Sequence, residues 1–162
     1  MTGNPAFRAT ALPAGLLDQL DGQMQGRDHL YPLLAQYEDT DAGGIVYHSA
    51  YLNYAERGRS AFLRLHGIAL ADWLDQAGQT IVVRQLNITY EAPARLGNRI
   101  LVRSALRRIT PVRAEISQII ENAADGHIFA RLLVEGVWVG VGQGACRMPA
   151  EIRAVMEGLV SE

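Results

Sequence analysis

The segment that decides the fold is Tyr37-Glu-Asp-Thr-Asp-Ala-Gly-Gly-Ile-Val-Tyr-His48, followed closely by Tyr51-Leu-Asn-Tyr-Ala-Glu-Arg57. It predicts a strand end, then a turn with two aspartates and two glycines, and then the first turn of an amphipathic helix. Gly43 and Gly44 suit such a turn, because glycine permits positive φ and close backbone approach. A carboxylate would then lie beside the free N–H groups of a helix start. This arrangement suits attack on a carbonyl.

The residues after this turn carry a clear helical signal. Apolar or small residues recur at spacings of four and three, which predicts a helix over 48–65 with one buried stripe. The stripe consists of Tyr51, Ala55, Gly58, Phe62 and Leu65. Glycine within a helix costs about 1 kcal/mol relative to alanine, so Gly58 on the stripe predicts close packing against a sheet. Gly67 is expected to end the helix.

The rest of the chain predicts strands and two short helices. After Gly78 the hydrophobic pattern changes to a period of two, which is typical of half-buried strands. One long helix and a run of antiparallel strands together predict an α+β fold. The expected strands are Leu30–Tyr37 and segments within 79–90, 100–106, 114–120 and 127–141, and the expected short helices are Ala69–Ala77 and Ala150–Leu159.

The longer string DTDAGGIVYHxxYLxYxExxR resembles the hotdog-fold acyl-CoA thioesterases of the 4-hydroxybenzoyl-CoA thioesterase class. It is most similar to the bacterial branch associated with the Tol–Pal envelope system. The resemblance is near-continuous from Tyr37 to about Arg59, and looser through Val82-Val-Arg and Tyr90-Glu-Ala-Pro-Ala-Arg-Leu96, over roughly residues 31–149. It implies the hotdog fold, a curved antiparallel sheet wrapped around one long central helix. It also implies hydrolysis of an acyl-CoA thioester to a free acid and CoA.

Length and composition fit one globular domain. The chain has 162 residues, of which 49% are hydrophobic and 20% charged. We expect a single hotdog domain over 29–162, preceded by a partly flexible extension over 1–28 with a short helix near Pro13–Met24. The net charge of −2 and the absence of a basic block argue against nucleic acid as a partner. No apolar run approaches the length of about 20 residues that spans a bilayer, so no stable membrane insertion is expected.

Cysteine and histidine usage bounds the remaining chemistry. The single cysteine, Cys146, excludes an intramolecular disulfide, which fits a reducing, cytoplasmic compartment. The four histidines show no paired spacing, so no metal site is expected. The resemblance implies no cofactor beyond the coenzyme A that is part of the substrate.

Asp41 is the first candidate for catalysis. The resemblance assigns it the role of the family's catalytic carboxylate, as nucleophile on the thioester carbonyl or as base for water. Its alternative role is a turn or helix-capping carboxylate. His48 could contact the substrate or move a proton, or simply satisfy hydrogen bonds at the helix start. Tyr37 could orient the carboxylate through its hydroxyl, or pack in the core. Asp39 is expected to stabilise the turn.

The substrate-binding candidates lie in two regions. Gly44, Val46 and Tyr47 belong to the turn, where backbone N–H groups over 46–48 would polarise the carbonyl. Val83 and Arg84 would come from a partner chain, because the resemblance implies sites between subunits of a homodimer or homotetramer. Coenzyme A carries phosphates that arginines could meet, or these arginines could be solvated charges on strand edges. They are Arg95, Arg107, Arg108 and Arg113.

Three alternatives remain open from the sequence. Glu56 is a rival carboxylate on the helix, although an ion pair with Arg59 three residues later is its expected role. A hotdog dehydratase fits the turn motif poorly. A module that binds acyl-CoA or acyl carrier protein without turnover is the non-enzymatic alternative, and acyl carrier protein is also a second possible carrier of the substrate.

Overall fold

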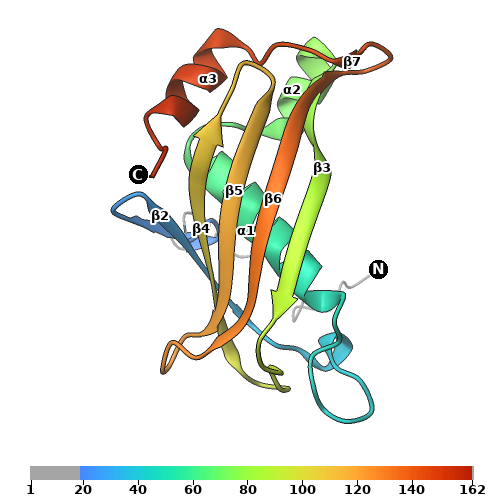
Figure 1. The fold of residues 1–162 in the computed structure, drawn as a ribbon, viewed down its shortest axis with the longest axis vertical. Helices are drawn as coiled ribbons and strands as arrows, with labels where there is room; N and C mark the ends of the chain where they lie inside the picture. Colours follow the sequence, from blue (N-terminus) through green and yellow to red (C-terminus); the bar gives the residue numbers. More distant parts are fainter. Residues whose placement is uncertain (1–18, 162) are drawn as a thin grey trace, which may run out of the picture.

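The computed structural model describes residues 19–161. In this part of the chain, one seven-stranded antiparallel sheet curves around a long helix, and two short helices lie at one end (Figure 1). The strand order is β1-β2-β4-β5-β6-β3, and β7 pairs with β6. The arrangement is the expected α+β fold. The elements are β1 (Gln23–Gln25), β2 (Asp28–Leu34), η3 (Tyr37–Asp39), α1 (Ala50–Leu65), α2 (Leu70–Ala77), β3 (Gln79–Tyr90), β4 (Arg99–Ile109), β5 (Arg113–Asn122), β6 (Ile128–Gly140), β7 (Gly144–Ala145) and α3 (Ala150–Glu157).

Helix α1 lies across the inner face of the sheet, as predicted. Gly58 allows this close approach, because a Cβ there would lie 2.8 Å from Cγ1 of Val102 on β4. Gly67 has φ of +75° and follows the helix end. Two details differ from the prediction. The helix begins at Ala50, two residues later than expected, and Leu65 at its end is 39% exposed.

A network of buried polar groups lies between α1 and the sheet. Arg59 is 9% exposed, and its Nη1 donates to Oε1 of Gln118 at 2.8 Å. Nε2 of Gln118 donates in turn to the carbonyl of Ala55 at 3.0 Å and to Oγ of Ser104 at 2.9 Å. Buried polar atoms that are paired in this way avoid a large desolvation cost. The network therefore fixes how α1 sits on β4 and β5.

The start of the described chain differs from the sequence prediction. The first predicted strand ends at Leu34 rather than Tyr37, because residues 37–39 turn into the short 3₁₀ helix η3. Residues 23–25, which include the end of the expected N-terminal helix, form β1 and pair with β2. Residues 19–22 form a turn instead of an α-helix, and residues 13–18 of that expected helix lie outside the described residues. The boundary between extension and domain at 28/29 stays a prediction.

Strand β3 forms one edge of the sheet, and it contains a β-bulge that sequence patterns do not predict. It pairs with β6 on one side, with a register shift between Val83 and Gln85. A second shift occurs between Leu106 and Arg108 where β4 pairs with β5. Strand β6 lies between β5 and β3, as its continuous apolar sequence predicted. No helix among the described residues is long and apolar enough to cross a membrane.

Candidate active site

The turn before α1 folds around the carboxylate of Asp41. Oδ1 of Asp41 accepts the N–H of Gly43 at 2.8 Å, and its backbone N–H donates to the carbonyl of Ile45 at 2.9 Å. Gly44 has φ of +72°, a conformation that glycine adopts without strain. A Cβ on Gly43 would lie 3.1 Å from Oδ1 of Asp41. The two glycines thus have the two roles that the sequence predicted for them, positive φ and close approach.

Two strand-like contacts hold this turn against the rest of the protein. Thr40 bridges to Val46, and Ile45 bridges to Arg95 in the connection between β3 and β4. The N–H of Val46 donates to the carbonyl of Ala94 at 2.8 Å, and the N–H of Tyr47 donates to the carbonyl of Asp39 at 2.8 Å. These bonds fix the turn as a rigid platform for the start of α1.

The same bonds correct the expected set of oxyanion donors. The N–H groups of Val46 and Tyr47 are already engaged, so they cannot also polarise a substrate carbonyl. Within the described part of the chain, no acceptor meets the N–H groups of His48 and Ser49. They lie at the start of α1, where the helix dipole is positive.

His48 is exposed at the mouth of the site and is held through its backbone. Its carbonyl accepts the phenol of Tyr90 at 2.9 Å, and its ring packs against that of Tyr47 at 4.4 Å between centroids. Tyr51 is 2% exposed, and its hydroxyl accepts the N–H of Ala94 at 2.9 Å. Burial raises the pKa of the Tyr51 phenol. Tyr51 is therefore a core residue beneath the site, as predicted.

An open cleft of about 380 Å³ brings these groups together. The turn forms one wall, and the end of β3 with the residues that follow it forms the other. The cleft unites Asp41, Val46, Tyr47 and His48 of the predicted site residues, while Gly44 lies within the turn itself. The lining residues are Asp41, Ile45, Val46, Tyr47, His48, Tyr51, Tyr90, Glu91, Ala92 and Pro93.

The two aspartates of the turn have different environments. Asp39 is 9% exposed, and its Oδ2 accepts the N–H of Gln36 at 2.7 Å, which agrees with a turn-stabilising role. Its carboxylate also lies near the buried Tyr54. The pKa of the Tyr54 phenol is raised, mainly by burial and to a smaller extent by the nearby Asp39 carboxylate. Asp41 is exposed to the cleft. Of the two, only Asp41 can meet a ligand.

Tyr37 is not positioned as the sequence predicted. Its side chain is 84% exposed on η3, and among the described residues its hydroxyl makes no hydrogen bond to Asp41. The contacts to its neighbours come from its backbone, because its carbonyl accepts the N–H of Thr40 at 3.2 Å and the Thr40 hydroxyl at 2.9 Å. The cause is the early end of β2, which leaves Tyr37 on a turn instead of a strand.

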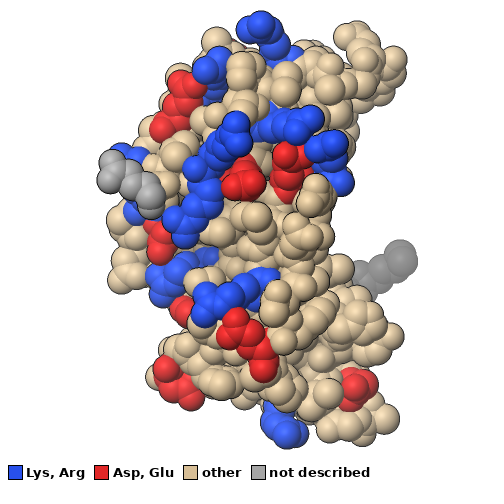
Figure 2. All heavy atoms as spheres, viewed as in Figure 1, with Lys and Arg blue, Asp and Glu red and all other residues tan. Residues whose placement is uncertain are grey.

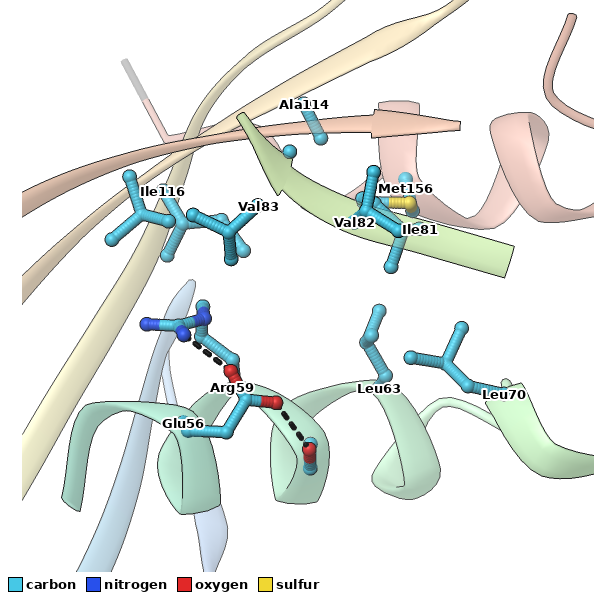
Figure 3. Close-up of a pocket in the computed structure, with 13 residues that line it drawn as sticks. Glu56, Arg59, Leu63, Leu70, Ile81, Val82, Val83, Ala114, Ile116 and Met156 are labelled. Carbon is cyan, nitrogen blue, oxygen red and sulfur yellow. Dashed lines mark hydrogen bonds and ion pairs between the residues drawn. The ribbon is translucent and has the colours of Figure 1, made fainter. Parts of the chain in front are cut away.

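A second, narrow pocket of about 60 Å³ lies between α1 and β3 (Figure 3). Its walls are apolar and include Leu63, Ile81 and Val83, while Glu56 and Arg59 lie at one side. Glu56 pairs with Arg59 and accepts the Ser60 hydroxyl at 3.1 Å. The predicted ion pair is thereby confirmed, and the Glu56 carboxylate is engaged on both oxygens.

The remaining predicted substrate contacts fall in different places. Val83 lines the apolar pocket and is 47% exposed. Arg84 does not face this pocket, because the register shift turns it to the outer face of the sheet, where Nη1 pairs with Oε1 of Glu135 at 2.7 Å. Arg95 is exposed beside Ile45 at the rim of the turn.

The geometry agrees with a comparison against known families. The model of the "Thioesterase-like superfamily" matches residues 35–156, from the end of β2 to α3. This chain belongs to that superfamily. The match includes the turn, α1, the edge strand β3 and both pockets, so the features described above lie within the region shared with other thioesterases.

Individual members of the superfamily support the assignment. The chain is 34% identical over 93 residues to the acyl-CoA thioester hydrolase YbgC of Escherichia coli O6:H1. The aligned region covers 57% of this chain and 69% of that protein. A probable thioesterase from Bartonella henselae is 29% identical with a TM-score of 0.69, over 75% of this chain and 99% of that one. The 1,4-dihydroxy-2-naphthoyl-CoA thioesterase Slr0204 from Synechocystis is 19% identical, with a TM-score of 0.75 over 80% of this chain and 95% of that one. At this identity the likeness is evidence for the fold alone.

These findings confirm the hotdog fold and the class of thioester hydrolases for this member of the superfamily. The association with the Tol–Pal system stays a prediction. Sequence reasoning missed Tyr90 as part of the cleft and Arg59 as a buried group. Tyr90 could have been found from its place at the end of an alternating strand, just before the Ala92-Pro-Ala94 connection that contacts the turn.

Proposed function

We propose that this protein hydrolyses an acyl-CoA thioester to the free acid and CoA, and that Asp41 is its catalytic carboxylate. The observation that carries the proposal is that one open cleft is lined by both Asp41 and His48, and that the His48 N–H, just before α1, meets no acceptor among the described residues. A carboxylate supplies the nucleophile or base, and free N–H groups at a helix start stabilise a developing oxyanion.

Both chemical routes use the same atoms. Oδ1 of Asp41 is held by Gly43, while Oδ2 meets no donor in the described residues and is free to react. As nucleophile it would attack the thioester carbonyl and release the CoA thiolate, and water would then hydrolyse the mixed anhydride. As base it would take a proton from water during the attack. His48 at the cleft mouth could deliver a proton to the leaving thiolate.

The apolar pocket supports a site shared between two copies of the chain. Val83 and Tyr90 are seven residues apart on β3, about 23 Å at about 3.3 Å per residue. Antiparallel pairing of two β3 edges would bring Tyr90 of one copy beside residues 79–81 of the other. The cleft of one chain would then open toward the apolar pocket of its partner, where the acyl group would lie against Val83 and Ile81.

The exposure of the β3 edge favours such pairing. Val82 and Val83 are 43% and 47% exposed, and a long apolar edge strand is a template for pairing with another chain. A homodimer, or a homotetramer built from two of them, follows from this proposal. Arg95 at the rim of the turn would meet the polar part of the substrate.

The test is thiol release from a panel of acyl-CoA esters with short, medium and long aliphatic groups and a hydroxybenzoyl group. Turnover that persists when a chelator is added would support the proposal. Sedimentation velocity should show that the active protein is a dimer or a tetramer. Esters carried by acyl carrier protein form the second arm. If all esters bind and none is hydrolysed, the protein is a binding module instead.

A further inference from the structure

Arginine and glutamate side chains form a compact cluster on the outer face of the sheet, away from α1 and from the cleft. Figure 2 shows basic side chains gathered around acidic ones over this face. We call these residues the outer-face cluster. They come from four neighbouring strands and are Arg84, Arg107, Arg108, Arg113, Glu115 and Glu135.

Two β-bulges build this cluster. Alternation along a strand would send Arg107 and Arg108 to opposite faces, but the register shift after Leu106 leaves Arg107 as an extra residue. Arg108 then pairs across from Glu115, while Nε of Arg107 donates to Oγ of Ser117 on the same face at 2.7 Å. Two consecutive arginines thus share one face.

The second bulge acts in the same way on β3. Arg84 is the extra residue between Val83 and Gln85, and it meets Glu135 on β6. Bulges that turn side chains in this way are often found next to functional sites. Here two of them, on strands that flank β5 and β6, direct arginines toward the same two glutamates.

The charges of the cluster do not cancel. Glu115 and Glu135 lie directly across from each other, so their repulsion requires neighbouring cations. Arg84 and Arg113 both pair with Glu135, at 2.7 and 3.4 Å, and hold the pKa of that carboxyl below its usual range. Four arginines against two glutamates leave two positive charges here, on a chain whose net charge is −2.

The surplus charge borders a hollow. A depression of about 110 Å³ is lined by Arg108, Thr110, Arg113 and the two glutamates. The Thr110 hydroxyl accepts the backbone N–H of Arg113. Within the described residues, Arg108 meets no carboxylate within ion-pair distance, while Arg107 lies outside this hollow and donates to the Ser117 hydroxyl. Guanidinium groups that converge without enough acidic partners have the geometry that binds phosphate through paired hydrogen bonds.

We propose that the outer-face cluster binds a phosphate group, with Arg108 and Arg113, the two arginines that line the hollow, as the main ligands and with Glu135 ordering Arg84 and Arg113. The chemistry fits the phosphates at the nucleotide end of coenzyme A, which rests on the proposed function. It fits equally the phosphates of a free nucleotide, which does not.

The experiment is calorimetric titration of the full chain with CoA, ATP, inorganic phosphate and pantetheine at low salt. The variant is Arg108→Gln with Arg113→Gln, and the matched control is Arg99→Gln, an exposed arginine on β4 outside the hollow. We expect CoA or ATP to bind on the order of tenfold more weakly to the double variant. Binding to the control should be unchanged, and pantetheine should bind all three proteins alike.

The arms separate the possible sources. A loss confined to CoA identifies the nucleotide end of the substrate, and the KM for acyl-CoA should then rise while that for acyl-pantetheine does not. A similar loss for ATP and CoA identifies a general nucleotide-phosphate site, even if the protein hydrolyses no thioester. Equal affinities for the wild type, the double variant and the control would overturn the proposal. The cluster would then be only a ladder of ion pairs between neighbouring strands.

Discussion

The phenol of Tyr90, the last residue of β3, donates a 2.9 Å hydrogen bond to the backbone carbonyl of His48. The Tyr90 ring also meets the buried Tyr51 edge-on, at 5.5 Å between centroids. One end of the edge strand is therefore bonded to the turn that leads into α1. We therefore expect the position of β3 to influence the position of this turn.

Replacement of Tyr90 by phenylalanine should reduce kcat/KM for acyl-CoA. The ring contacts remain while the bond to His48 is lost, so the turn is held less firmly. A single hydrogen bond of about 1 kcal/mol corresponds to a loss of roughly fivefold. Tyr31→Phe is the control, because Tyr31 lies on β2 outside the cleft and its hydroxyl makes no hydrogen bond within the described residues. Equal kinetics for the two variants would argue against the coupling.

Replacement of Gly44 by alanine should impair both stability and activity. Its φ of +72° costs an L-residue about 1–2 kcal/mol. The turn is also expected to distort around Asp41. Gly126→Ala imposes the same cost at φ of +74°, in the hairpin loop between β5 and β6. The midpoint temperature of thermal unfolding should fall by a similar amount in both variants, while only Gly44→Ala should lose thiol release. Loss of activity in both would point to global destabilisation.

Replacement of Gln118 by leucine should lower the free energy of unfolding by about 2–4 kcal/mol. The change leaves the buried Arg59 guanidinium and the Ser104 hydroxyl without their amide partner. Urea denaturation measures the difference. The exposed Gln76 on α2 provides the matched control, and Gln76→Leu should change the value by less than about 0.5 kcal/mol. A small effect at Gln118 would contradict the importance of this network.

Stability should fall as the pH drops below about 6.5, because of His29. Burial lowers the pKa of this fully buried imidazole from 6.5, against the smaller raising effect of its bond to the Asp21 carbonyl, and His66 lowers it further. The unfolded chain therefore binds more protons than the folded chain below pH 6.5. Stability is complete above that pH and is lost as the pH falls toward the folded-state pKa.

The measurement is the urea midpoint between pH 7.5 and pH 5. A His29→Gln variant should lose part of the pH dependence, whereas His127→Gln, an exposed control in the β5–β6 hairpin, should keep it. Identical slopes for the wild type and His29→Gln would show that other groups cause the acid sensitivity.

Local patterns predicted the parts of the fold that depend on local chemistry. The spacing of Tyr51, Ala55 and Phe62 predicted the buried face of α1, and Gly58 predicted its close approach to the sheet. Gly43 and Gly44 predicted the turn geometry. Each of these residues is constrained by its immediate neighbours in the chain, so the information is present in the sequence.

Features that depend on strand pairing could not be predicted in this way. Alternation along β3 gives no sign of the bulge that moves Arg84 to the outer face, because a bulge is defined by the partner strand. Arg59 reads as a surface arginine until Gln118, 59 residues later, lies opposite it. Tyr37 was misplaced for a related reason, because the chain leaves the sheet at Leu34, where pairing with β4 ends.

The most direct test of the account compares Asp41→Asn with the wild type in two measurements, single-turnover thiol release and CoA affinity. Asp75→Asn, an exposed carboxylate on α2, is the matched control. We expect Asp41→Asn to slow thiol release by about 10²- to 10⁴-fold, with CoA affinity and assembly unchanged. Thiol release within about threefold of the wild type would contradict it and would make Glu56 the carboxylate to test next.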